Sequence, residues 1–195
     1  MMCEPKFVPF EYIDSLKIRK HIALFYADAE YARMIEFRFL KNGLIAGEQC
    51  VYVTDDDTGT IILKMLRYGV PLEYLQTKKL RVCQIHSPIG SHDEMLSECK
   101  KEIEVIFSDM VKPFRIVARM MPDVSTFKGM SVEIELETSV HRIFEDFGGY
   151  IMCPYDLSKI EKSKSSEWLA ELMKSHHTVI YAPRFGEGGV FYAPE

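Results

Sequence analysis

The turn YADAE at residues 26–30 stands where many α/β proteins bind phosphate, and it begins at the last residue of the apolar run HIALFY. In nucleotide-binding α/β proteins, the turn between this strand and the next helix carries glycines and a lysine that hold the phosphates. Residues 26–33 contain neither, and Asp28 and Glu30 would repel a triphosphate from the positive end of the helix. We therefore expect no phosphate binding at this turn.

A phenol and several carboxylates follow two of the predicted strands. Tyr26 and Asp28 come after the first strand, and Asp55 and Asp56 come after the second. Ligands of open α/β sheets bind in the crevice at the carboxyl ends of the strands. We interpret these residues as a candidate ligand-binding site. The alternative is that they pack and cap helices, since acids and threonine suit a helix start.

Cys153 and Tyr155 end a later strand and are expected to join the same crevice. A nucleophilic cysteine needs a nearby histidine or helix N-terminus. His176 and His177 are candidates for that histidine, but the sequence does not place either beside Cys153. A buried inert thiol is therefore the preferred interpretation. His176 and His177 are adjacent in the chain, so their side chains are expected to point apart. No second pair of candidate ligands occurs at ligand spacing, and no metal site is therefore predicted. His21 is interpreted as a structural histidine, and no catalytic residue or cofactor is assigned.

Predicted strands and helices alternate along the chain, and these elements position the candidate residues. Such alternation predicts an α/β fold, with a mostly parallel sheet of six or seven strands and helices on both faces. No linker divides the chain, so residues 1–195 are predicted to form one domain, with a terminal strand or hairpin at 178–193. The predicted strands are 21–26, 49–54, 80–86, 114–121, 150–155, 178–183 and 188–193. The predicted helices are 29–42 (ended by Asn42-Gly43), 58–68, 91–110, 130–146 and 165–176, with a helical turn at 72–76.

Composition excludes several classes of protein. The net charge is −5 and no basic run occurs, so direct nucleic-acid binding is not expected. The apolar stretches are far shorter than the roughly 20 residues of a membrane helix. The N-terminus lacks the apolar core of a signal peptide. The five cysteines form no CxxC pair, which favours reduced thiols in a cytoplasmic protein.

Several short motifs occur in a defined order along the chain. They are HIALFY from His21 to Tyr26, Gly43-Leu44, Gly47-Glu48, Cys50-Val51-Tyr52-Val53, the acids Glu135 and Glu137, Cys153-Pro154-Tyr155-Asp156, and His176 before the strand TVIYAP. In this order they resemble the MEDS domain, the sensory domain shared by methanogen and methylotroph proteins and the dichloromethane-responsive repressor DcmR. The resemblance covers about residues 18–183.

The resemblance implies a relative of the RecA/KaiC-like ATPase fold that has lost its P-loop. It further implies a non-enzymatic sensory or regulatory domain in signal transduction or transcriptional regulation, with small hydrocarbon derivatives as ligands. Residues 120–129 depart from the family, whose members often carry a glutamate and a tryptophan there. The chain has no room for the helix-turn-helix of DcmR, so output would require a protein partner or a second copy of the chain.

Two alternatives remain open. The first is a degenerate nucleotide-binding protein or ATPase, because Asp55, Asp56 and Asp57 fall where KaiC-like ATPases carry catalytic acids. The second is an oligomeric scaffold, because RecA-like domains often assemble.

Overall fold

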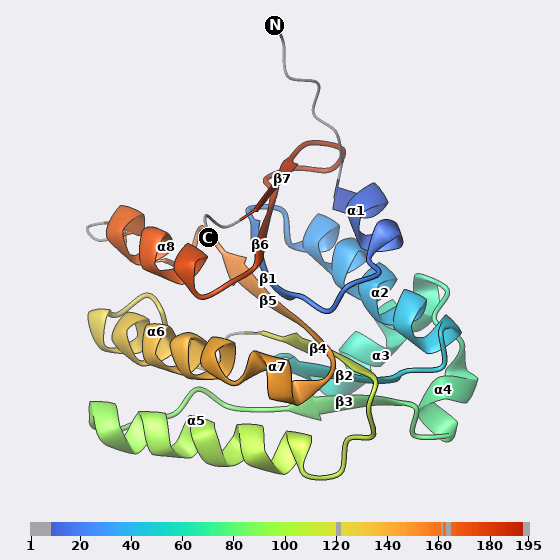
Figure 1. Cartoon of the computed structure of the whole chain (residues 1–195), viewed down its shortest axis with the longest axis horizontal. Helices are drawn as coiled ribbons and strands as arrows, with labels where there is room; N and C mark the ends of the chain where they lie inside the picture. Colours follow the sequence, from blue (N-terminus) through green and yellow to red (C-terminus); the bar gives the residue numbers. More distant parts are fainter. Residues whose placement is uncertain (1–8, 120–121, 161, 163–164, 193–195) are drawn as a thin grey trace, which may run out of the picture.

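A single sheet of seven strands organises the part of the chain that the computed structural model describes, residues 9–119, 122–160, 162 and 165–192. The strand order is β3-β2-β4-β5-β1-β6-β7 (Figure 1). All neighbours are parallel except β6 and β7, which form an antiparallel pair. The predicted fold class is therefore confirmed, and residues 178–192 pair as a hairpin. The strands are β1 (His21–Tyr26), β2 (Gln49–Thr54), β3 (Leu80–Gln84), β4 (Phe114–Ala118), β5 (Tyr150–Asp156), β6 (Thr178–Ala182) and β7 (Gly189–Tyr192).

Helices cover both faces of the sheet (Figure 1). One face carries α1 (Pro9–Ser15), α2 (Ala29–Ile45), α3 (Thr58–Arg67) and α4 (Leu72–Gln76). The other carries α5 (His92–Phe107), α6 (Phe127–Arg142), α7 (Phe144–Phe147) and α8 (Ser165–Lys174). The predicted helix 130–146 is thus two helices, and α1 was not predicted. No helix among the described residues has the length and apolar character needed to cross a membrane.

The alternation of side chains along the strands separates two cores. Every residue of β1 is buried, as expected for a central parallel strand covered on both faces. Ile22, Leu24 and Tyr26 pack with α2, whereas Ala23 and Phe25 pack on the opposite face with residues of α6 and α8. The two faces of the sheet can therefore carry different chemistry.

Helix α2 continues past Gly43, where the sequence predicted its end. The left-handed residue is Gly47, with φ of 85°, and Gly43 is an interior position of the helix. A Cβ on Gly43 would lie 2.6 Å from Cδ of Arg115. Arg115 donates to Glu48 at 2.6 Å and both side chains are buried. Glycine stands at residue 43 because the ion pair approaches the helix backbone closely, and not because the helix ends there.

Candidate functional site

Asp28 occupies the start of α2, where a P-loop would present its amides to phosphate. Its carboxylate accepts hydrogen bonds from the backbone N–H groups of Glu30 and Tyr31, at 3.0 and 3.1 Å. The free donors of the helix start are thus bonded to the protein's own acid. This is the capping role that the sequence left open as an alternative.

The acids after β2 are placed differently from one another. Asp56 accepts from Arg33 at 2.6 Å, and Asp57 caps α3 by accepting from the backbone N–H of Thr60 at 2.8 Å. Asp55 is exposed at the surface. Each of the two bonded acids is therefore committed to a partner within the protein.

A buried hydrogen-bonded network joins the strand ends on the α2 face. Arg119, just after β4, donates to Glu36 at 2.8 Å and to the hydroxyls of Tyr26 and Tyr52 at 2.9 Å each. Tyr52 in turn donates to Glu36 at 2.6 Å. Burial raises the pKa of Tyr26 to about 12, and burial and the Glu36 carboxylate raise the pKa of Tyr52 well above its usual range. Both phenols therefore stay neutral at physiological pH.

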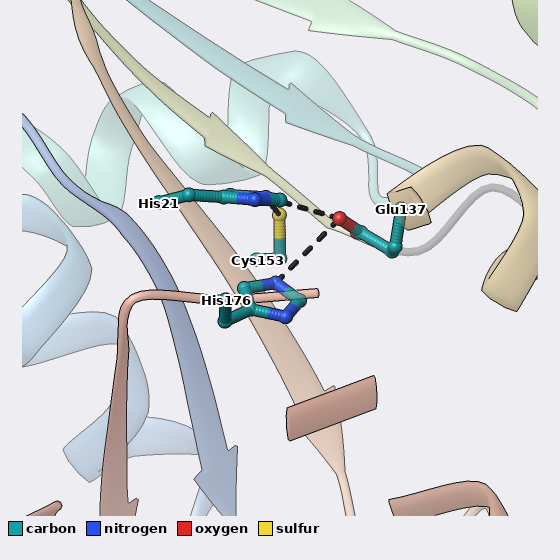
Figure 2. A group of neighbouring side chains, drawn as sticks. All are labelled: His21, Glu137, Cys153 and His176. Atoms are coloured by element: carbon teal, nitrogen blue, oxygen red, sulfur yellow. Dashed lines mark hydrogen bonds and ion pairs between the residues drawn. The ribbon is translucent and has the colours of Figure 1, made fainter. Parts of the chain in front are cut away.

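A second polar cluster lies within the core on the opposite face (Figure 2). We call His21, Glu137, Cys153 and His176 the buried cluster. Glu137 Oε2 lies 3.0 Å from His21 Nε2 and 3.5 Å from His176 Nε2, and Cys153 Sγ lies 3.4 Å from His21 Nε2. One ligand-type atom from each residue lies within 4.8 Å of the others. Tyr155 donates to Glu137 Oε1 at 2.6 Å.

Burial, the histidines and the carboxylate of Glu137 set the electrostatics of the buried cluster. Burial would raise the pKa of Glu137, but His176, His21 and Tyr155 outweigh it and hold that pKa at about 2. Burial lowers the pKa of His176 to about 3, so its imidazole is neutral at physiological pH. Burial and the carboxylate of Glu137 raise the pKa of Cys153 and of the neighbouring Glu133 well above their usual ranges.

A cavity of about 60 Å³ adjoins the buried cluster, between the sheet and helices α5 and α6. Glu137 and Cys153 form part of its wall, together with Glu133 and Arg119. The rest of the lining is apolar: Val53, Ile103, Ile106, Phe107, Ile116, Ala118, Leu136, Val140 and Ile151.

The six predicted ligand-site residues do not form one crevice. Tyr26 packs in the core on the α2 face, with Asp28, Asp55 and Asp56 in the turns that follow β1 and β2. Cys153 and Tyr155 pack in the core on the other face. The expectation that they would join Tyr26 is corrected, because alternate residues of paired parallel strands point to opposite faces of the sheet.

Comparison with protein families supplies the identity of the domain. The family model of the MEDS domain, described as the methanogen/methylotroph, DcmR sensory domain, matches residues 20–177. The chain belongs to the MEDS family. A search of curated protein sequences found no match to this MEDS chain.

Two solved structures share the fold of this MEDS domain. A KaiC-like protein, PH0186 from Pyrococcus horikoshii OT3, superposes with a TM-score of 0.56 at 15% identity, over 88% of this chain and 76% of that one. The flagellar accessory protein FlaH from Methanocaldococcus jannaschii superposes with a TM-score of 0.60 at 12% identity, over 96% of this chain and 81% of that one. At such identities the similarity shows the fold alone, and it agrees with the predicted RecA/KaiC-like core.

The sequence of this MEDS domain gave little sign of the buried cluster. Its members come from β1, α6, β5 and the segment after α8, so no two lie at the short spacing typical of ligand motifs. The sequence instead indicated a structural histidine at His21 and an inert thiol at Cys153. The one available signal was that His21, Cys153 and His176 all lie in or beside predicted strands, and the structure shows these strands to be neighbours in the sheet.

Proposed function

We propose that this MEDS domain is a non-enzymatic sensor that binds a small, largely apolar organic molecule in the cavity between the sheet and helices α5 and α6. The observation that carries the proposal is the lining of that cavity. Nine of its lining residues have apolar side chains, and the polar groups belong to Arg119, Glu133, Glu137 and Cys153. Ligand sites commonly combine an apolar wall with a few polar groups that orient the ligand.

The size of the cavity limits the class of ligand. A single water needs roughly 10–15 Å³ of such volume. At about 60 Å³ the cavity accommodates a molecule of a few non-hydrogen atoms. Short alcohols, halogenated methanes and simple methyl compounds fit this limit, and they are the hydrocarbon derivatives that the family resemblance implies.

The hydrogen bonds already formed at the carboxyl ends of the strands support a sensor over an ATPase. Asp28 already bonds the first amides of α2, and Arg119 already pairs with Glu36. The first amides of α2 and the guanidinium of Arg119 therefore already have partners within the protein. Signal output in this proposal requires a second protein or a second copy of the chain, and the free thiols of the described cysteines support a cytoplasmic location.

The test is a thermal-shift screen of the purified chain against small alcohols, halogenated methanes and methyl compounds, with Mg²⁺-ATP and Mg²⁺-GTP in parallel. A ligand at 100 times its dissociation constant stabilises the native state by about 2.7 kcal/mol, which raises the melting temperature. We expect such a shift with an organic compound and none with a nucleotide.

Filling the cavity provides the matched comparison. Val140→Phe places an aromatic ring at the cavity wall, and Val105→Phe makes the same change at an exposed position of α5. We expect Val140→Phe to abolish the ligand-induced shift and Val105→Phe to retain it, each measured against the same variant without ligand. A shift with a nucleotide would favour the ATPase alternative, and no shift with any compound would favour the scaffold.

A further inference from the structure

We propose that His21, Glu137, Cys153 and His176 bind one Zn²⁺ ion. The buried cluster in Figure 2 gathers four residues of metal-ligand type from separate elements at a single point in the core. This inference goes beyond the sensor function and does not depend on the identity, or the existence, of an organic ligand.

The spacing of the donor atoms is close to that of tetrahedral coordination. With bonds of about 2.0–2.3 Å from zinc to nitrogen, oxygen and sulfur, neighbouring ligand atoms of a tetrahedral site lie roughly 3.3–3.6 Å apart. Of the six separations in the buried cluster, three are 3.0, 3.4 and 3.5 Å, the first slightly shorter than this range. All four atoms lie within 4.8 Å of one another, so small side-chain movements complete the site.

The donor atoms converge, but two of them lack a well-formed hydrogen bond. Glu137 Oε2 and His176 Nε2 are buried 3.5 Å apart, and neither meets hydrogen-bond geometry within the described part of the protein, although Oε2 also lies 3.0 Å from His21 Nε2. Unsatisfied polar atoms in a core are costly and call for an explanation. An ion at the point where these atoms converge would satisfy both of them.

The groups behind the donors are those that commonly support metal ligands. His176 Nδ1 lies 2.8 Å from the backbone carbonyl of Leu172, a contact that fixes the proton on Nδ1 and leaves the Nε2 lone pair directed at the cluster. Tyr155 donates to Glu137 Oε1 and leaves Oε2 for the ion. His176 and Glu137 thus each have an outer partner that orients them, whereas His21 Nδ1 is buried without a hydrogen-bond partner in the described part of the protein.

The donor set also balances the charge of the ion. One carboxylate, one thiolate and two neutral imidazoles together neutralise Zn²⁺, so the occupied site carries no net charge into the core. The Cys153 thiol loses its proton to solvent as the Zn–S bond forms. Nitrogen and sulfur donors select zinc and similar transition metals over Mg²⁺ or Ca²⁺, which prefer oxygen.

The test uses the full chain stripped of metal by a chelator. Zn²⁺ binding is followed by competition with a chromophoric chelator, and Co²⁺ serves as a spectroscopic substitute. We expect one ion per chain, the visible bands of four-coordinate Co²⁺, and a thiolate-to-Co²⁺ charge-transfer band in the near ultraviolet. Absence of stoichiometric binding, or a cobalt spectrum without the thiolate band, would overturn the proposal without bearing on the organic ligand.

Variants then identify the ligands, with folding checked by circular dichroism. Cys153→Ser should remove the thiolate band, whereas Cys83→Ser, outside the cluster, should leave the spectrum and the affinity unchanged. Tyr155→Phe should weaken Zn²⁺ binding by about 10- to 100-fold, the usual effect of losing an outer partner. A thiolate band that survives Cys153→Ser would contradict the site, and the wild-type measurements remain decisive if a variant fails to fold.

Discussion

Glu36 and Arg119 form a buried ion pair, so water solvates neither charge well. The side chain of Glu36 is fully buried and that of Arg119 is 10% exposed. Removing one partner of a buried pair leaves an uncompensated charge and typically costs about 3–5 kcal/mol. We expect Glu36→Ala to lower the free energy of unfolding by about that amount, measured by urea denaturation.

An exposed ion pair between helices α2 and α3 provides the control. Glu30 contacts Lys64 at 2.7 Å, with side-chain exposures of 60% and 33%. Solvent screening limits such a pair to about 1 kcal/mol or less, so Glu30→Ala should change stability little. Equal effects of the two substitutions would show that the Glu36–Arg119 network contributes no more than a surface contact.

At the scale of elements, the start of α2 decides what the turn after β1 does. Asp28→Ala removes the carboxylate that bonds two backbone amides, and loss of such a cap costs about 0.5–2 kcal/mol. Asp55→Ala removes an exposed carboxylate and is expected to change stability by no more than about 0.5 kcal/mol. Chemical denaturation of the two variants gives the comparison. A larger loss for Asp55→Ala would mean that Asp55 has a structural role that its exposed position does not explain.

The elements themselves were largely predictable because local pattern determines them. The apolar run of β1 and the helical periodicity after Ala29 are properties of neighbouring residues, and β1 and β2 begin and end where the sequence predicted. The glycine at 43 was misinterpreted because its reason is the approach of Arg115, which is 72 residues away in the chain. Helix α1 was missed because it is short and its buried residues pack on distant elements.

The site was less predictable than the fold because its contacts join residues that are far apart in the sequence. Capping by Asp28 is local and was foreseen as an alternative. The meeting of His21 with Glu137 depends on which strands become neighbours and on how α6 lies across them. No spacing along the chain contains that information.

Across the whole molecule, stability should fall from the centre of the sheet to its β7 edge. All six residues of β1 are buried, and β1 pairs with β5 and β6. Strand β7 is partly exposed and, among the described strands, pairs only with β6. Local opening requires the least free energy where few apolar contacts are broken. We expect hydrogen exchange, followed by mass spectrometry, to be slowest in β1 and β5 and fastest in β7. Rapid exchange in β1 would contradict this order.

The position of β1 has a consequence for synthesis of the protein on the ribosome. In the sheet β1 lies between β5 and β6, yet it emerges first among the strands and its partners follow more than a hundred residues later. At about 5–20 residues per second, on the order of ten seconds pass before β5 is made. During that interval HIALFY is an apolar segment without a partner, of the kind that aggregates readily. We expect the nascent chain to depend on chaperones that bind it early, before the central strand finds its place.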